Sequence, residues 1–465
     1  MVNYIKDSSL EEKKYRKGYT TSKKILLGFL IAILAGTVLL SLPIASVSGK
    51  PDILTALFTA TTSVCVTGLV VVDTYSYWTL FGKVVILILI QLGGLGIVAF
   101  TSALAIVTRR KVTLKNRVMI HDAFGLNNLS GLVKFVKKVI LGTFCVEMLG
   151  AILYLPSFIP RFGLKGIWFA FFNAISAFCN AGIDIIGPDS LMSFYSDPLV
   201  LIDSMFLIVM GGLGFVVWWD IIDTGRKVKN KKIKLKSFFD NLRTHSKIVL
   251  VATFTLLVSA WIFVFILEFN NPDTIGNMSL GDKLLNSCFQ SFTLRTAGFA
   301  AVNQGGLKDS TVLISIIYML IGGSPVGTAG GIKTVSIAVI FCSVIATIKG
   351  RDQALVFKKS INEGLIKRAI SVAFISIMFL FVFSILLMET NGINFVDAVF
   401  EMGSAFATVG LSRGITGSLN PFGRILVIVA MYLGRIGPIS MFIAFSNRYS
   451  SLNSIHVGEA DIIVG

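Results

Sequence analysis

The sequence predicts an all-α polytopic membrane protein in which four tandem repeats, each a helix, a pore half-helix and a helix, surround one pseudo-fourfold pore. Of the 465 residues, 54% are apolar and only 14% are charged, against roughly 25% charged in soluble domains. Several apolar runs reach the ~20 residues needed to cross a bilayer. A short segment that ends in glycine and a bulky apolar residue occurs four times, which indicates four copies of one unit.

The four recurring segments are Val64–Leu69, Phe178–Ile183, Leu294–Phe299 and Phe406–Leu411, and their glycines lie 114, 116 and 112 residues apart. Loops of this Thr-Val-Gly type can replace the hydration shell of potassium with backbone carbonyls. Glycine allows the backbone angles that such a loop needs. A simple helix break would explain one such loop, but four in register favour an ion filter. The predicted filter residues are Cys65, Val66, Thr67, Gly68, Cys179, Asn180, Ala181, Gly182, Arg295, Thr296, Ala297, Gly298, Ala407, Thr408, Val409 and Gly410.

Each repeat reads as a spanning helix, a short half-helix, the glycine segment and a second spanning helix, which gives eight spans and four re-entrant half-helices. The expected helices are 25–44, 52–64 and 80–108; 139–157, 166–178 and 198–222; 247–268, 281–292 and 311–348; and 369–388, 394–405 and 422–446. The repeats then occupy 25–108, 139–222, 247–348 and 369–446, separated by 1–24, 109–138, 223–246, 349–368 and the tail 447–465. A cleaved signal peptide is the alternative for the first run, but its removal would leave the first repeat incomplete.

Basic residues predict the topology. Segments 1–24, 109–138, 225–247, 349–368 and the C-terminus hold 31 of the 42 lysines and arginines. Cytoplasmic loops collect these residues, so both termini are expected inside and the re-entrant loops open from outside. The basic residues lie between apolar spans, which argues against nucleic acid as a partner. Five cysteines without a CxxC pair and three scattered histidines predict neither disulfides nor a metal centre.

The half-helices share a second regularity. Phe58, Phe172 and Phe400 each lie ten residues before their glycine, and Phe289 lies nine before Gly298. Ordinary packing explains any single phenylalanine, but the shared register supports the repeat. Half-helices that point their C-terminal ends toward the pore would favour cations there.

Arg295 is unexpected in a filter that passes cations. We expect its side chain to point behind the filter toward a carboxylate. Glu401 and Asp184 are the candidate partners, and the sequence does not choose between them.

A glycine-rich stretch interrupts the second helix of the third repeat. It resembles a Walker A loop only superficially, because Ile332 separates Gly331 from Lys333. Such a stretch cannot remain a regular helix, so we expect an intramembrane loop that gates the pore. Its residues are Gly322, Gly323, Ser324, Pro325, Val326, Gly327, Thr328, Ala329, Gly330, Gly331, Lys333 and Thr334.

Arg435 lies within the predicted span 422–446. A charge at membrane depth costs several kcal/mol unless it is paired or hydrated. Arg435 is therefore expected to bind carbonyls of the 322–334 loop and to stabilise its closed state. The alternative is an arginine that snorkels from a helix end.

The filter segments, the broken third-repeat helix and the arginine of the last helix together resemble the Trk/Ktr/HKT superfamily of potassium transporters. The eight spans are most similar to the KtrB-type membrane subunits of Ktr systems. The resemblance implies a homodimer in the bacterial plasma membrane that passes potassium down its gradient, with sodium as a candidate activator. It also implies a cytosolic octameric ring of RCK subunits (KtrA-like) that carries ATP or ADP, with no cofactor on this chain.

The basic loops 109–138, 225–247 and 349–368 suit such a partner, although anionic membrane lipid explains them equally well. The tail 447–465 is a candidate dimer or partner contact. The alternatives within transport are a Trk-type subunit and a sodium- or proton-coupled symporter. Symporter folds usually contain inverted repeats, whereas these four repeats run in one orientation. An enzyme is not expected, because no catalytic constellation lies at membrane depth.

Overall fold

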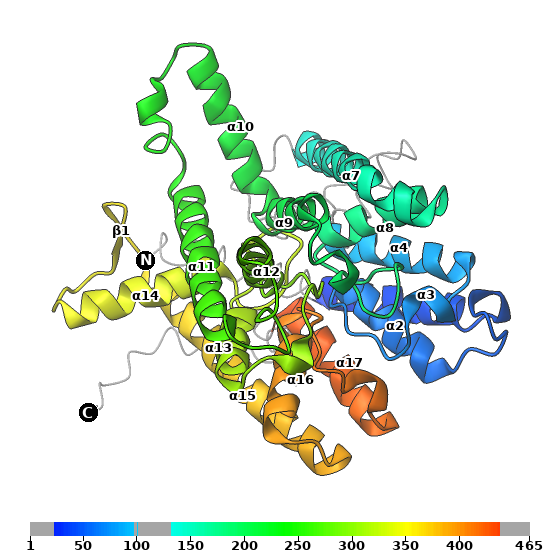
Figure 1. Cartoon of the computed structure of the whole chain (residues 1–465). Coiled ribbons are helices and arrows are strands. Elements are labelled where there is room, and N and C mark those ends of the chain that lie inside the picture. The colour runs from blue at the N-terminus through cyan, green and yellow to red at the C-terminus, as the bar shows by residue number, and fades with distance from the viewer. Residues whose placement is uncertain (1–22, 97–99, 101–131, 438–465) are drawn as a thin grey trace, which may run out of the picture.

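The computed structural model describes residues 23–96, 100 and 132–437 (Figure 1). Most of the expected segment 1–24 and of the linker 109–138 lies outside these residues, as do the last part of the helix expected at 422–446 and the whole tail 447–465. After a first helix at Lys23–Leu40, the helices are α2 (Ile53–Cys65), α3 (Thr74–Tyr77), α4 (Leu80–Leu95), α7 (Leu132–Phe162), α8 (Lys165–Phe178), α9 (Pro198–Gly212), α10 (Phe215–Lys229), α11 (Thr244–Glu268), α12 (Leu280–Thr293), α13 (Asp309–Leu320), α14 (Thr334–Ile348), α15 (Glu363–Asn391), α16 (Phe395–Ala407) and α17 (Pro421–Ile436).

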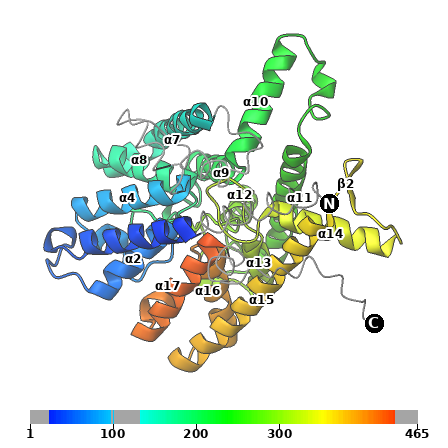
Figure 2. The same cartoon turned by 180° about the vertical axis from the view of Figure 1, so that it is seen from behind.

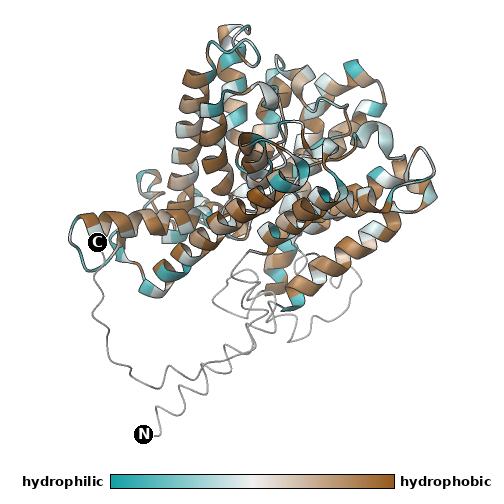
Figure 3. Ribbon diagram, turned by 90° about the horizontal axis from the view of Figure 1, so that it is seen from below, coloured by the Kyte–Doolittle hydropathy of each residue, from teal (hydrophilic) through white to brown (hydrophobic). Residues whose placement is uncertain are grey.

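Among the described residues, four long apolar helices could each cross a membrane: Lys23–Leu40, α7, α11 and α15. They are the expected first helices of the four repeats. Only 22% to 33% of their most apolar windows is buried inside the chain, so large apolar side chains face outward. Figure 3 shows hydrophobic residues along most of their length. Such surfaces are stable in lipid, which agrees with the predicted polytopic membrane protein.

The four expected half-helices are α2, α8, α12 and α16. Each has only 13 or 14 residues, or about 20 Å at 1.5 Å per residue, too short to span the bilayer. Three begin at a side-chain cap: Asp52, Ser279 and Asn394 each accept a backbone N–H of the first turn. The C-terminal end of each leads into a glycine segment.

The second helix of every repeat is broken or ends early, which the sequence predicted only for the third. α9 and α10 meet at 97° around Gly214, whose φ is +87°, so the expected continuous helix 198–222 is wrong. α4 ends before Gly96 (φ +80°) and α17 before Gly437 (φ +86°). Positive φ is readily available to glycine, so the same residue type ends the helix in three repeats.

Short elements complete the described chain: the 3-10 helices η1 (Pro43–Ala45), η2 (Met192–Phe194), η3 (Leu235–Ser237), η4 (Gln304–Gly306) and η5 (Thr416–Ser418), and an antiparallel hairpin of β1 (Leu355–Val356) and β2 (Lys359–Ser360). The hairpin lies in the expected linker 349–368, between α14 and α15. Phe357 at its turn packs edge-on against Phe239, with ring centroids 6.0 Å apart. α10 and the start of α11 project from the rest of the chain (Figures 1 and 2).

Candidate functional site

The four predicted filter glycines lie in one ring. A Cβ on each would strike the carbonyl oxygen just before the next glycine: Ala181 for Gly68 (2.6 Å), Ala297 for Gly182 (2.5 Å), Val409 for Gly298 (2.6 Å) and Thr67 for Gly410. The last contact closes the ring, because it returns to the first repeat. The four segments therefore meet at one axis in chain order, with four carbonyl groups beside the glycines.

The four segments also share a backbone conformation. The residue two before each glycine has a positive φ: Val66 (50°), Asn180 (58°), Thr296 (62°) and Thr408 (54°). The glycines themselves have φ values of 102°, 64°, 83° and 95°. Positive φ is uncommon outside glycine, so its occurrence at the same position of all four segments indicates one structural unit.

Side-chain hydroxyls hold two of the glycine amides, while three threonine hydroxyls of the filter are unpaired. The N–H of Gly68 donates to Thr62 Oγ1 and that of Gly410 to Ser404 Oγ, each at 3.0 Å. Within the described chain, the buried hydroxyls of Thr67, Thr296 and Thr408 have no hydrogen-bond partner. Unpaired buried oxygens are costly, whereas a dehydrated cation would use them as ligands.

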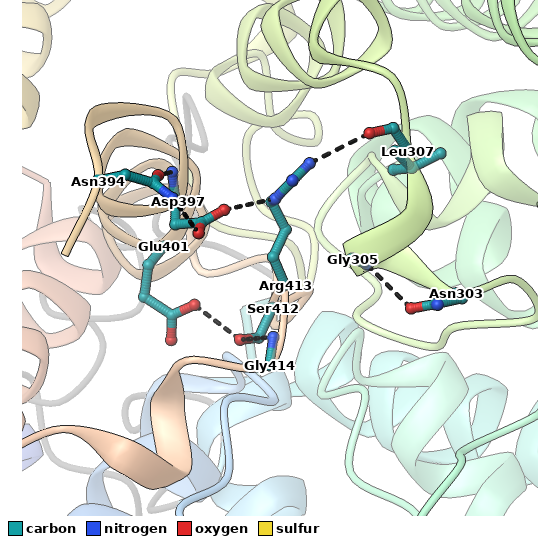
Figure 4. Close-up of polar contacts among 9 residues, drawn as sticks. All are labelled: Asn303, Gly305, Leu307, Asn394, Asp397, Glu401, Ser412, Arg413 and Gly414. Carbon is teal, nitrogen blue, oxygen red and sulfur yellow. Dashed lines mark hydrogen bonds and ion pairs between the residues drawn. The ribbon is translucent and has the colours of Figure 1, made fainter. Parts of the chain in front are cut away.

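A cavity of about 300 Å³ is lined by all four glycines, and we call it the outer cavity because the predicted topology places it outside. Asp73, Asp184 and Asp189 also line it. One arginine of its rim, Arg413, is neutralised, because its Nε donates to Asp397 Oδ1 at 2.6 Å (Figure 4). The mouth of the site is thus acidic, as a cation pathway requires.

Arg295 points behind the filter, but its expected carboxylate partner is wrong. Its guanidinium donates to the Gly322 carbonyl at 3.3 Å. Glu401 instead accepts from the hydroxyls of Ser412, at 2.8 Å, and Thr416. Asp184 accepts from the amide of Ile186. The arginine therefore contacts the start of the 322–334 loop.

The predicted gate loop lies directly against two filter segments. The Thr328 hydroxyl donates to Asn180 Oδ1 at 2.8 Å and lies 3.1 Å from the Phe178 carbonyl. A Cβ on Gly330 would strike the side chain of Thr408. The amides of Ser324 and Thr328 donate to the last carbonyls of α9, Gly212 (2.9 Å) and Gly211 (3.1 Å). The break after α9 is therefore where the loop binds.

Arg435 holds this loop from the other side. It lies at the end of α17, whereas the sequence placed it inside a longer helix. The alternative of a snorkelling arginine does not hold, because its guanidinium donates to the carbonyls of Thr328 in the loop and Gly93 in α4. Lys333 donates to the Ala329 carbonyl at 2.7 Å, within the loop. Arg435 thus connects the loop to the first and fourth repeats.

Sequence analysis missed one set of buried polar residues. Each half-helix contains one phenylalanine nine or ten residues before its filter glycine. The residue after that phenylalanine is polar in all four half-helices: Thr59, Asn173, Gln290 and Glu401. Of these four, the sequence analysis named only Glu401, as a candidate partner of Arg295. An alignment of the four half-helices on their phenylalanines shows the polar residue at the next position. Among the described residues, no group of three or more histidines, cysteines or acids could hold a metal ion.

Comparison with known proteins agrees with this geometry. The family model of TrkH, a cation transport protein, matches residues 10–456. The chain is 36% identical to the Ktr system potassium uptake protein B of Bacillus subtilis over 96% of this chain and 97% of that one. It is 35% identical to the potassium/sodium uptake protein NtpJ of Enterococcus hirae, over 92% and 93%.

The crystal structure of the potassium transporter TrkH from Vibrio parahaemolyticus has the same fold, with a TM-score of 0.70 over 90% of this chain and 85% of that one, at 16% identity. The family model covers nearly the whole chain, and its proteins are transporters and not enzymes. The chain therefore belongs to the TrkH family of cation transport proteins.

Proposed function

We propose that this chain conducts potassium into a bacterial cell through one pore, as the membrane subunit of a Ktr-type system. The closed ring of four glycines and their neighbouring carbonyls is the observation that carries the proposal. The names of the relatives support it, since they are potassium or potassium/sodium uptake proteins.

In this mechanism the acidic outer cavity concentrates cations. Carbonyl oxygens of the ring then replace water, and the uncharged ligands let the ion leave again. The half-helices α2, α8, α12 and α16 direct their C-terminal partial charge toward the path. The loop 322–334 closes the inner side, and Arg435 stabilises that closed arrangement through the Thr328 carbonyl.

The same proposal includes cytoplasmic termini, a homodimer and a cytosolic ring of RCK subunits that binds ATP or ADP. Potassium is the transported ion and sodium an activator. The basic turn between α10 and α11 supports a cytosolic face, since it holds Lys231, Lys232, Lys234 and Lys236. The system name of the Bacillus relative supports a partner subunit. A coupled symporter is less consistent with four segments of one backbone conformation around one axis.

Gly298→Ser tests the filter. A Cβ there would lie 2.6 Å from the Val409 oxygen and 2.9 Å from Gly182 Cα, at a φ of +83°, so the ring must widen. We expect the preference for potassium over sodium to fall about tenfold, the effect of about 1.4 kcal/mol. The measurement is flux into liposomes under matched potassium and sodium gradients.

Gly187→Ser is the matched control, because it lines the same outer cavity and has open space around it. Wild-type selectivity is expected there. Unchanged selectivity in Gly298→Ser, with folded protein and measurable flux, would remove the filter assignment. Flux that requires a sodium or proton gradient in the wild-type protein would favour the symporter.

A further inference from the structure

In two of the four repeats, the polar residue after the recurring phenylalanine bonds to the segment that follows the filter glycine. In the third repeat, Gln290 and Gln304 form a reciprocal amide pair: Gln290 Nε2 donates to Gln304 Oε1 at 2.8 Å, and Gln304 Nε2 donates back to Gln290 Oε1 at 3.0 Å. Their side chains are 1% and 4% exposed. A buried pair that satisfies both amides holds its two segments in one position.

The fourth repeat has an equivalent contact. Glu401 in α16 accepts from Thr416 and from Ser412, and Thr416 Oγ1 lies 2.9 Å from Ser412 Oγ (Figure 4 shows the contact with Ser412). Gln304 and Thr416 each lie six residues after their filter glycine and each begins a 3-10 helix, η4 or η5. The two contacts therefore occupy the same place in two repeats, with different chemistry.

The first two repeats lack this bond. Thr74 takes the position six after Gly68 and begins α3, but in the described structure the short side chain of Thr59 forms no hydrogen bond to it. In the second repeat the position is Pro188, which has no polar side chain, and the buried amide of Asn173 has no partner in the described chain. Among the described residues, the bond between the half-helix and the residue six positions after the glycine therefore occurs in repeats three and four.

We propose that Gln290–Gln304 and Glu401–Thr416 are struts that set the width of the outer filter and hence its discrimination between potassium and sodium. The proposal rests on the proposed potassium pore. Each strut joins the half-helix that precedes a filter glycine to the residue six positions after that glycine. The filter segment between these two points is therefore held at both ends. Loss of a strut lets the carbonyls near Gly298 or Gly410 move, without removing any group that contacts the ion.

The first experiment is a double-mutant cycle with Gln290→Leu, Gln304→Leu and the double variant, in which leucine approximates the size of glutamine. Each single variant is expected to lower the potassium-to-sodium flux ratio about tenfold, as for one lost buried hydrogen bond. The double variant is expected to lower the flux ratio no more than either single variant, because both substitutions remove the same contact. If the two single effects on the ratio add in the double variant, the proposed strut is wrong.

The second experiment uses Thr416→Val, which removes the hydroxyl, and Thr416→Ser, which keeps it. The valine variant is expected to lose selectivity and the serine variant to retain it. Tyr318→Phe is the control, because it removes an interhelical bond to Ser259 (2.7 Å) away from the filter. If Tyr318→Phe lowers the ratio as much as the strut variants, the effect is general destabilisation and the proposal fails.

Failure of the pore and failure of the struts are distinguished by a second measurement on the same proteins. The rise in melting temperature caused by potassium is compared with that caused by sodium, which requires no flux. A wild-type protein with no selective flux would contradict the proposed function, yet loss of the potassium-specific rise in the strut variants would still support the struts. Unchanged ratios and unchanged melting shifts would overturn them.

Discussion

At the scale of single residues, Asp184 connects the charge of the outer cavity to pH. It lies two residues after Gly182 and lines the cavity above the ring, outside the spanning helices. Burial raises the pKa of Asp184 to about 6, although hydrogen bonds from Ser190 and the Ile186 amide lower it in part. The carboxylate is therefore charged above pH 6 and neutral below it.

We expect potassium uptake at subsaturating potassium to fall between pH 7.5 and 5, with a midpoint near 6. One charge about 10 Å from an ion in water changes its occupancy roughly twofold, so the change in flux is of that size. Asp184→Asn should already have the lower flux at pH 7.5 and a flatter profile. Asp240→Asn, in the turn before α11, is the control. An Asp184→Asn profile that still falls at pH 6 would assign the titration elsewhere.

The sequence predicted the ring glycines but not the partner of Arg295. The glycines recur at a fixed interval, and the same backbone angles require the same residue type in each repeat. The partner of Arg295 depends on how segments 27 residues apart pack, and the Gly322 carbonyl that it contacts has no signature in the side-chain sequence. For this reason two carboxylates were plausible and neither was correct.

At the scale of elements, the gate loop is held at its ends and touches the filter at its tip. The amide of Gly322 donates to the Ile332 carbonyl at 2.9 Å and that of Ile332 to Leu320 at 3.0 Å. The tip carries the contact of Thr328 with Asn180. The tip is also bonded through the Thr328 amide to Gly211, so the proposed opening of the gate requires these bonds of the tip to break while those of the ends remain.

Deletion of residues 326–329 should raise passive potassium flux in liposomes several-fold, because it removes the contact between the tip and the filter. Arg435→Ala keeps the loop length but removes its link to the Thr328 carbonyl, so we expect a smaller rise in the same direction. Lys50→Ala is the control, since Lys50 is an exposed residue in the segment before α2. Equal or lower flux in both variants, with folding intact, would contradict the gate.

The expected half-helices agree with α2, α8, α12 and α16 to within two residues, but the helix breaks were missed in three repeats. In the first two repeats the sequence Gly-Gly-Leu-Gly at the end of α4 and α9 is apolar and short, so it continues the hydrophobic pattern of a span; the fourth repeat has Gly-Arg-Ile-Gly at 434–437. The cost of leaving the helix at Gly214 is offset by bonds to the distant loop, such as that from the Phe215 amide to the Val326 carbonyl at 3.1 Å. Local sequence does not contain that compensation.

At the scale of the whole molecule, the four repeats are alike at the filter and different below it. Within the described ranges, the 322–334 loop belongs to the third repeat alone, and Arg435 of the fourth is the one arginine beside the glycine where the first part of a second helix ends. Asn180 replaces threonine in the second repeat and contacts the loop. The repeats of a single chain can thus differ in these features, whereas a pore of four identical subunits would carry four copies of the loop, the arginine and the asparagine.

α10 provides a direct connection from the gate to the proposed cytosolic face. Its first amide, that of Phe215, bonds to the loop, and its last residue leads into the basic turn 230–243. That turn packs on the β1–β2 hairpin through Phe239 and Phe357, and Lys247 lies 5.7 Å and 5.8 Å from the two ring centroids. A partner that displaced this turn would move α10 and so the loop.

We therefore expect Lys231→Glu, Lys232→Glu and Lys234→Glu together to weaken activation by the proposed RCK ring without changing the basal flux of the chain alone. These lysines lie on the exposed turn, far from the filter, and charge reversal would repel an acidic partner. The measurement is flux into liposomes with and without ring loaded with ATP or ADP. Lys165→Glu is the control: it reverses the same charge at the start of α8, on the proposed outer side, and Lys165 forms no ion pair with a described residue. Arg161→Glu is unsuitable, because Arg161 pairs with Asp197. Full activation in the triple variant would place the partner on another surface, and lost basal flux would show that the turn supports the pore itself.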